Sequence, residues 1–127
     1  MNIPKILVVD DLDDIREFYA KYLRRQNCTV FIAASGEEGW EIFQKERPHI
    51  VISDLRMEGM GGAEMLKKIR EIDKVCYCIT LTGTSEEYIK LDELAALGIE
   101  CMFKPKTQEQ VFEKIQPVIA KITQASP

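Results

Sequence analysis

Short apolar segments alternate along the chain with longer segments in which apolar residues recur at helical spacing. The short segments are rich in β-branched residues and mostly lack polar alternation, which is typical of strands buried on both faces of a parallel sheet. The strands predicted in this way are Lys5–Val9, Thr29–Ala33, Ile50–Ser53, Tyr77–Leu81 and Glu100–Phe103.

The helical segments between these strands carry recognisable start and stop signals. Apolar residues recur from Ile15 to Leu23, which predicts the first helix. Ser35 and Glu38 form a capping-box pattern for a second helix through Phe43, with Pro48 just past its end. A short third helix is predicted over residues 63–70.

The last two helices are predicted from the same kinds of signal. Thr84 with Glu87 and Thr107 with Gln110 repeat the capping-box pattern, and Gly98 suits the end of the fourth helix. Pro117 falls inside the last apolar stripe, where it removes one backbone donor, so the fifth helix should kink or begin anew there.

Five strands and five helices in strict alternation predict an α/β doubly wound fold, an open parallel sheet covered on both faces with right-handed crossovers. The 127 residues fit one domain. We expect residues 1–123 to form it and residues 124–127 to form a loose C-terminal tail.

Composition excludes some classes of partner. The net charge of -4 argues against direct nucleic-acid binding, which needs a basic face. No apolar run approaches the roughly 20 residues that span a bilayer, so no membrane contact and a cytoplasmic location are expected. The four cysteines lie in or beside predicted strands, which favours buried thiols over a zinc site: Cys28, Cys76, Cys78 and Cys101.

Polar residues interrupt the apolar strands at their C-terminal ends. Asp10 and Asp11 end the first strand, Asp54 the third, Thr82 the fourth, and Lys104 with Pro105 the fifth. In an open parallel sheet these ends converge on one crevice, where ligands bind. Each residue alone has a structural alternative, such as a core hydroxyl for Thr82 or a solvated strand end for Lys104. Those alternatives do not explain why all of these polar residues fall at the same edge of the sheet.

The charges of this group indicate a particular chemistry. Three close carboxylates repel one another, and Lys104 offsets only one of them. The two remaining charges match one divalent cation, and oxygen ligands with open water positions favour Mg²⁺. Asp54 is the candidate nucleophile because a carboxylate can form an aspartyl phosphate. Thr82 and Lys104 could then contact the phosphoryl oxygens.

Four stretches of this sequence together resemble the receiver domains of bacterial response regulators: ILVVDD at Ile6–Asp11, PHIVISDLRMEGMGG at Pro48–Gly62, LTG at Leu81–Gly83 and FKP at Phe103–Pro105. The resemblance covers nearly the whole chain. It implies a flavodoxin-like sheet of strand order 2-1-3-4-5.

The resemblance also implies roles for individual positions. Asp54 would be the phosphoacceptor, with Mg²⁺ bound directly by Asp11 and Asp54, through water by Asp10, and by the backbone carbonyl of Arg56. Thr82 and Lys104 would bind the phosphoryl group. A cis peptide bond before Pro105 would aim Lys104. The family usually has an aromatic residue where Cys101 stands, which leaves Phe103 as the possible switch aromatic.

A receiver of this kind would take its phosphoryl group from a histidine kinase or phosphotransfer protein and signal to an unknown downstream protein. It would be no classical enzyme, since it catalyses only its own phosphotransfer and dephosphorylation. We expect a monomer or weak dimer that switches the face made by the fourth helix, fifth strand and fifth helix.

Several alternatives stay open. The chain could be a non-switching receiver-like docking module, or the receiver fragment of a hybrid histidine kinase or a transcription regulator. A haloacid-dehalogenase-type phosphatase needs Asp-x-Asp where this chain has Asp10-Asp11. A flavodoxin-like electron carrier needs a phosphate loop where residues 11–14 are acidic. His49 could be a phosphohistidine, but a lone surface histidine is more often unremarkable.

Overall fold

The centre of the molecule is a five-stranded parallel sheet of order β2-β1-β3-β4-β5, the order that the resemblance implied. The computed structural model describes residues 3–55, 60–82, 88–103 and 108–124; of these, it does not describe the side chains of Thr82, residues 88–91, Phe103 and Gln108. The strands are β1 (Lys5–Val9), β2 (Thr29–Ala33), β3 (Ile50–Asp54), β4 (Tyr77–Thr82) and β5 (Glu100–Phe103).

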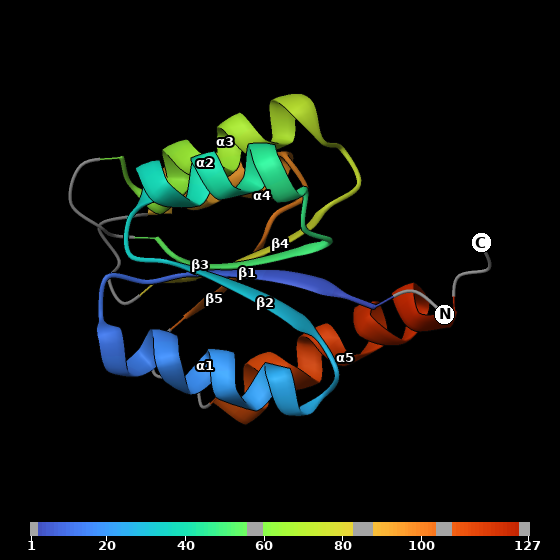
Figure 1. Cartoon of the computed structure of the whole chain (residues 1–127). Helices are drawn as coiled ribbons and strands as arrows, with labels where there is room; N and C mark the ends of the chain where they lie inside the picture. Colours follow the sequence, from blue (N-terminus) through green and yellow to red (C-terminus); the bar gives the residue numbers. More distant parts are fainter. Residues whose placement is uncertain (1–2, 56–59, 83–87, 104–107, 125–127) are drawn as a thin grey trace.

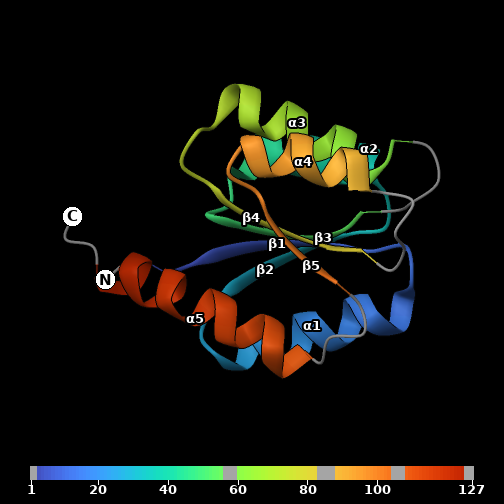
Figure 2. The ribbon, with the colours of Figure 1, turned by 180° about the vertical axis from the view of Figure 1, so that it is seen from behind.

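Within the described residues, five helices cover the two faces of this sheet. Helices α1 and α5 lie on one face, and α2, α3 and α4 lie on the other (Figures 1 and 2). This arrangement confirms the predicted doubly wound fold. The helices are α1 (Asp13–Arg25), α2 (Gly36–Glu46), α3 (Gly62–Ile72), α4 (Tyr88–Ala96) and α5 (Gln108–Gln124).

Each face of the sheet has its own apolar core. Beneath α1 and α5, the Phe112 ring stacks on Tyr22 with centroids 3.7 Å apart and meets the edge of Tyr19 at 5.6 Å. On the opposite face, Phe43 and Leu94 are completely buried. Because every residue of β3 is buried, this central strand contributes to both cores, as its apolar run Ile50–Ile52 predicted.

The helix starts agree only partly with the sequence signals. The Ser35 side chain accepts a hydrogen bond from the Glu38 N–H at 3.2 Å, and the Glu38 carboxylate accepts from the Ala34 N–H at 2.8 Å. The predicted cap of α2 is therefore confirmed, although Glu38 reaches one residue earlier than expected. Helix α1 begins at Asp13, and its capping residue Leu12 has no side-chain acceptor. Thr84, Glu87 and Thr107 lie outside the described residues.

Three helices are longer than predicted. Helix α2 continues to Glu46, and α3 runs from Gly62 to Ile72. The Asp73 N–H still donates to the Ile69 carbonyl at 2.8 Å, so the helical hydrogen bonds of α3 continue beyond residue 70. Helix α5 runs through Pro117 without a new start and includes Gln124, so it extends into the predicted tail. The Thr123 hydroxyl donates to the Ile119 carbonyl at 2.9 Å in this added turn.

Gly98 and the cysteines have the predicted roles. Gly98 follows α4 with a φ of +74°, the left-handed conformation expected for a helix-ending glycine. All four cysteines are free thiols; three are buried and Cys101 is half-buried. Among the described residues, no helix is both long and apolar enough to cross a bilayer.

Candidate functional site

Three carboxylates meet at the C-terminal edge of the sheet. Val9 of β1 pairs with Ser53 of β3, so the residues that follow them, Asp10 and Asp54, end neighbouring strands side by side. Asp11 comes next in the chain. Their nearest carboxylate oxygens all lie within 4.8 Å of one another. The predicted gathering of these three acids is therefore present.

The three carboxylates differ in their exposure to water. Asp10 is 5% exposed and Asp54 is 8% exposed, whereas Asp11 is an exposed residue. Burial penalises the charged form of a carboxylate unless hydrogen bonds or cations compensate it. Two carboxylates are thus held in the sheet edge, and the third faces the solvent from which a cation would arrive.

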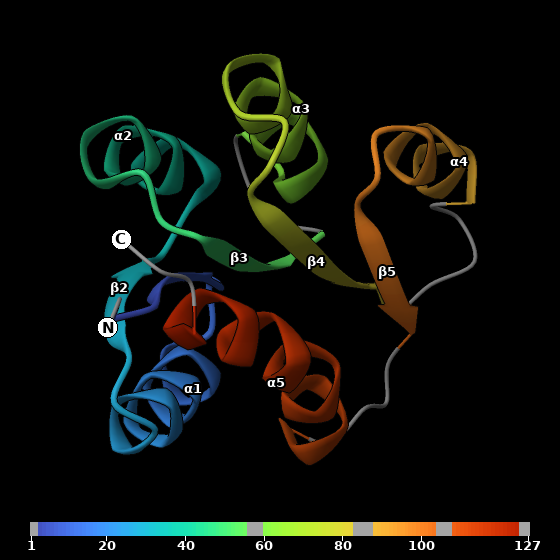
Figure 3. The same ribbon diagram turned by 90° about the vertical axis from the view of Figure 1, so that its right-hand side faces the viewer.

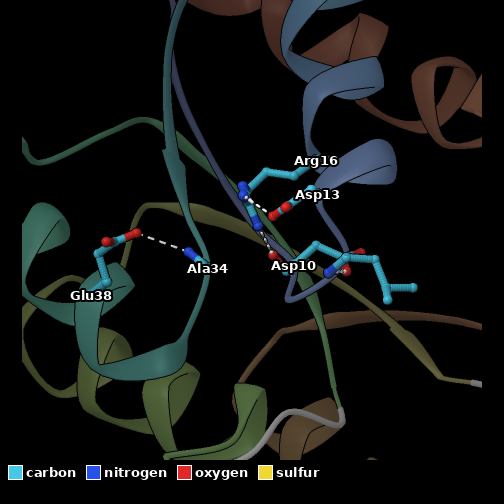
Figure 4. A network of polar contacts seen from close by, with 6 residues as sticks. Asp10, Asp13, Arg16, Ala34 and Glu38 are labelled. Carbon is cyan, nitrogen blue, oxygen red and sulfur yellow. Dashed lines mark hydrogen bonds and ion pairs between the residues drawn. The ribbon is translucent and has the colours of Figure 1, made fainter.

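Hydrogen bonds hold Asp10 at the start of the loop that leads to α1 (Figure 4). The Leu12 N–H donates to Asp10 Oδ1 at 2.9 Å, and the Asp10 N–H donates to the Ala33 carbonyl of β2 at 3.1 Å. Arg16 Nη1 donates to the Asp10 backbone carbonyl at 2.7 Å, while Nη2 pairs with the Asp13 carboxylate. The backbone beside the acids is therefore tied to both β2 and α1.

Arg16 is a residue of this site that the sequence reasoning did not identify. Its side chain is only 12% exposed, and it brings a guanidinium next to the loop that carries the acids. A basic residue in the first turns of a helix six positions after an acid is too common to predict this contact. Only the path of the chain between Asp10 and α1 reveals it.

The negative charge of the site affects the pKa of a neighbouring side chain, Tyr19. The pKa of Tyr19 is raised to about 12, first by burial and then by the negative charge of Asp10. A negative potential disfavours the tyrosinate because it adds a second negative charge nearby. The shift in the Tyr19 pKa therefore shows that the negative charge of Asp10 acts on the core side chains beneath α1.

Hydrogen bonds hold the backbone at Asp54 and at Leu55, the residue that follows it. Ser53 Oγ donates to the Asp54 carbonyl at 2.8 Å, and the Leu55 N–H donates to the Leu81 carbonyl of β4 at 3.0 Å. The Gly62 N–H donates to the Leu55 carbonyl at 3.1 Å, which brings the start of α3 against the same segment. These bonds fix the backbone on which the Asp54 carboxylate stands.

This set of donors suits a hard divalent cation. One oxygen from each of the three carboxylates lies close enough to the others for one ion to contact two or three of them. Carboxylate oxygens are the ligands that Mg²⁺, Ca²⁺ and Mn²⁺ prefer. The Asp10, Asp11 and Asp54 group could therefore hold a metal ion.

The structure describes only part of the remaining predicted site residues. Leu81 pairs with Asp54, and the next residue, Thr82, pairs with Phe103 of β5, so the backbones of Thr82 and Phe103 lie at the same edge of the sheet as the acids. The side chains of both lie outside the described part. Arg56, Lys104 and Pro105 also lie outside the described residues, so their predicted roles stay predictions.

Comparisons with known proteins agree with this geometry. The family model described as the response regulator receiver domain matches residues 6–116. The sporulation initiation phosphotransferase F of Bacillus subtilis is 37% identical over 82 residues, which cover 65% of this chain and 66% of that protein. The uncharacterized transcriptional regulatory protein YesN of Bacillus subtilis is 30% identical over 123 residues, 93% of this chain but only 33% of that protein.

A solved structure gives the same result for the fold. The chemotaxis response regulator CheY4 of Vibrio cholerae superposes with a TM-score of 0.79 at 31% identity, covering 91% of this chain and 98% of the other. The similarity therefore extends over nearly the whole chain. By contrast, the chain spans about a third of one curated relative that it matches and two thirds of another.

Proposed function

Because this chain belongs to the response regulator receiver domain family, we propose that it is a phosphorylation switch of two-component signal transduction whose phosphoacceptor is Asp54. Receiver domains are phosphoacceptor signalling modules rather than classical enzymes. One observation carries the proposal: Asp10, Asp11 and Asp54 gather within 4.8 Å at the edge of the sheet where α/β folds bind their ligands.

Asp54 is favoured over its two neighbours as the acceptor by its position. Asp54 is the last residue of the central strand β3 and pairs with Leu81 of β4, whereas Asp10 and Asp11 both follow the end of β1. Asp10 already accepts a hydrogen bond from the Leu12 N–H at 2.9 Å, which favours its carboxylate form and a supporting role. Asp11 is exposed and sits on the loop.

A bound Mg²⁺ would neutralise the acids and the incoming phosphoryl oxygens, which lowers the electrostatic barrier to the attack of a carboxylate on a phosphoryl group. The residues that would hold it are Asp11 and Asp54 directly, Asp10 through water, and Arg56 through its backbone carbonyl. The all-oxygen donor set fits this ion.

The chemistry at Asp54 is a phosphoryl transfer. A carboxylate oxygen of Asp54 forms a bond to phosphorus, while the bond from phosphorus to the donor, a phosphohistidine nitrogen or an acyl oxygen, breaks. The leaving imidazole or carboxylate keeps the electron pair of that bond. Thr82 would donate a hydrogen bond to one phosphoryl oxygen, and Lys104 would contact another as a point charge.

The signal would arise from geometry as much as from charge. A phosphoryl group adds about -1.5 to -2 charges, but Asp54 loses its own charge, so the net gain is about -1. Thr82 is paired in register with Phe103 of β5. A movement of Thr82 toward the phosphoryl group would therefore reach β5 directly. We place the switching surface on α4, β5 and α5, with Phe103 as its candidate aromatic residue.

The partners follow from the family. A histidine kinase or phosphotransfer protein would supply the phosphoryl group, and a downstream protein would read the α4–β5–α5 face. Because YesN is three times as long as the matched region, the chain could also act as the receiver part of a longer regulator. The downstream partner would then be a domain of that same protein.

The decisive experiment is phosphorylation by a small acyl phosphate with Mg²⁺, followed by intact-mass measurement. The expected result is one added phosphoryl group on the wild type and none on Asp54→Asn. Asp14→Asn is the matched control, because Asp14 is an exposed acid in the first turn of α1 and should be modified normally. A wild type that stays unmodified would favour the non-switching docking module. Phosphorylation of Asp54→Asn would mean that another residue is the phosphoacceptor.

A further inference from the structure

A cavity of about 250 Å³ opens at the edge of the sheet opposite to the acids. Figure 3 looks onto this edge, where the C-terminal part of α5 lies below the starts of β3 and β4. Five residues give its wall an apolar surface: Pro48, Val75, Tyr77, Val118 and Ile122. The length of β3, at about 3.3 Å per residue, separates the cavity from Asp54 by roughly 15 Å. The cavity is therefore independent of the phosphoacceptor site.

The floor of the cavity is held by backbone hydrogen bonds. The His49 N–H donates to the Lys5 carbonyl at 2.9 Å, and the Tyr77 N–H donates to the His49 carbonyl at 2.9 Å. These bonds extend the pairing of β1, β3 and β4 past the ends of the strands. The cavity is thus formed before any ligand arrives, which reduces the cost of binding.

Apolar side chains remain exposed at its mouth. Val75 is 91% exposed, and Ile72 just before it is 42% exposed. A valine in this position gains nothing from folding, because its methyl groups stay in water. A ligand with an apolar body would cover Val75 and complete the wall that Val118 and Ile122 begin.

The charged groups at the cavity are mostly cationic. Lys121 forms no ion pair within the part of the chain that the structure describes. Arg47 also lines the cavity, and one of its guanidinium nitrogens donates to the Ile72 carbonyl at 3.3 Å. Because a guanidinium has five N–H donors, most of them remain available to a ligand.

Of the described residues that line the cavity, one is an acid, Asp73, and backbone donors already compensate it. Asp73 Oδ1 accepts from the Val75 N–H at 2.8 Å and from the Cys76 N–H at 2.9 Å. His49 adds a further donor. Its Nδ1 accepts from the Lys5 N–H at 3.0 Å, so the neutral ring carries its proton on Nε2. The cavity therefore presents an excess of donors and positive charge in a chain whose net charge is -4.

We propose that this cavity binds a small carboxylic acid with a compact apolar body. The apolar wall takes the body, and Lys121 and Arg47 take the carboxylate. The volume lies just below the range of about 300–1,000 Å³ for drug-sized ligands, which suits one ring or a short branched chain. Inorganic phosphate would leave the apolar wall uncovered, and a neutral hydrocarbon would leave the cations unmatched. A protein partner needs a far larger surface, of the order of 800 Å² on each side.

The test uses 3-phenylpropionate as the probe and follows backbone amide shifts of the full chain by NMR. Saturable shifts are expected at Val75, Tyr77, Val118 and Ile122, with none at Asp10 or Asp54. The neutral 3-phenylpropionamide should bind roughly tenfold more weakly, because charge-assisted hydrogen bonds are about twice as strong as neutral ones. Equal binding of acid and amide would overturn the proposal.

Two substitutions at exposed positions test the assigned groups without risk to the fold. Lys121→Gln should weaken 3-phenylpropionate binding roughly tenfold, and Val75→Glu should abolish it by charge repulsion. Lys114→Gln removes the same charge from the same helix at a distance from the cavity and should leave affinity unchanged. If Lys114→Gln weakens 3-phenylpropionate binding as much as Lys121→Gln does, the effect comes from the overall charge of the protein. That result would overturn the assignment of Lys121 to the carboxylate.

Two other occupants are distinguished by further arms of the same experiment. An acetylated, amidated Glu-Glu-Leu-Glu peptide that binds where the small acid does not would assign the cavity to a protein partner. A dimer in sedimentation that Val75→Glu dissociates would assign it to a second copy of the chain. Either result overturns the proposal.

Discussion

The α-carbon of Gly62 lies so close to Asp54 that a β-carbon on Gly62 would stand 2.1 Å from the Asp54 carbonyl oxygen. No real β-carbon approaches a backbone oxygen that closely, so only glycine fits at this position. The start of α3 is thereby pressed against the backbone of the proposed phosphoacceptor. The steric role of Gly62 comes from the packing of α3 against this backbone.

Gly62→Ala is expected to destabilise the protein by about 1–3 kcal/mol, because the clash is with backbone that must move. Phosphorylation of Asp54 should slow at least tenfold, since a shift of about 1 Å in a reacting group can cost a factor of 100. Urea unfolding and acyl-phosphate labelling would measure the two effects. The control is Gly98→Ala, where φ is +74° and no atom lies within 4 Å of the added carbon. It should cost about 1 kcal/mol and leave phosphorylation unchanged.

Asp11→Asn should make the metal-free protein more stable and the Mg²⁺-containing protein relatively less stable. Removal of one of three mutually repelling carboxylates gains up to about 1 kcal/mol for an exposed pair near 4 Å. In the wild type, Mg²⁺ at 100 times its Kd should add about 2.7 kcal/mol, and this gain should shrink in the variant. Thermal unfolding with and without Mg²⁺ measures both, and Asp14→Asn should behave as the wild type. If Mg²⁺ stabilises Asp11→Asn as much as it stabilises the wild type, Asp11 is not a ligand of the metal site.

Arg70 is a buried cation held by three backbone carbonyls. Its Nε donates to Leu97 at 2.9 Å, and its Nη1 donates to Cys76 at 2.8 Å and to Asp73 at 3.2 Å. Arg70→Met leaves these carbonyls without the guanidinium, at a cost of about 1–3 kcal/mol in urea unfolding for each carbonyl that stays unpaired. Arg25→Met, at an exposed position near the end of α1, should stay within about 0.5 kcal/mol of the wild type. A small loss at Arg70 would mean that water replaces its bonds.

His49 should titrate below its usual pKa of 6.5. Although the residue as a whole is exposed, its Nδ1 faces the Lys5 N–H, and lost hydration there is the main cause of the lowered pKa. The Lys5 charge lowers the pKa further, and Asp73 opposes both. As His49 is the single histidine of the chain, its imidazole resonance in NMR reports the pKa without ambiguity. A value at or above 6.5 would contradict the geometry.

The same shift has a consequence for stability against pH. Because the folded pKa lies below the unfolded value, the unfolded state binds the proton first as pH falls. The contribution of His49 is therefore complete above pH 6.5 and is lost as pH falls from there to the folded pKa. His49→Asn keeps an acceptor for the Lys5 N–H but does not titrate. The difference in unfolding free energy between wild type and His49→Asn should be flat above pH 6.5 and should decrease below it.

Much of the fold could be predicted from local patterns. The strands Lys5–Val9, Thr29–Ala33 and Glu100–Phe103 have the predicted bounds. The local signal is strongest in Lys5–Val9, an apolar run rich in β-branched residues that is buried from Ile6 to Val9. The ends of α3 and α5 were predicted less well. Thr123 and Gln124 carry no helix-forming signal of their own, and they are helical because the turn before them packs on the sheet.

The candidate site divides in a similar way between sequence and structure. The sequence by itself determined that Asp10, Asp11 and Asp54 stand at the C-terminal ends of strands, because the residue that follows an apolar run is readable without coordinates. It also determined that these ends share one edge, since alternating strands and helices permit only a parallel sheet.

Only the tertiary structure decided which groups touch. Three features join segments whose spacing along the chain does not predict that they meet. They are the contact of Arg16 with Asp10, the close approach of Gly62 to Asp54, and the cationic cavity between β4 and α5. The physical reason is that side-chain contacts depend on the register of neighbouring strands and on how each helix lies across the sheet. Both are set by packing of the whole core rather than by any local run of residues.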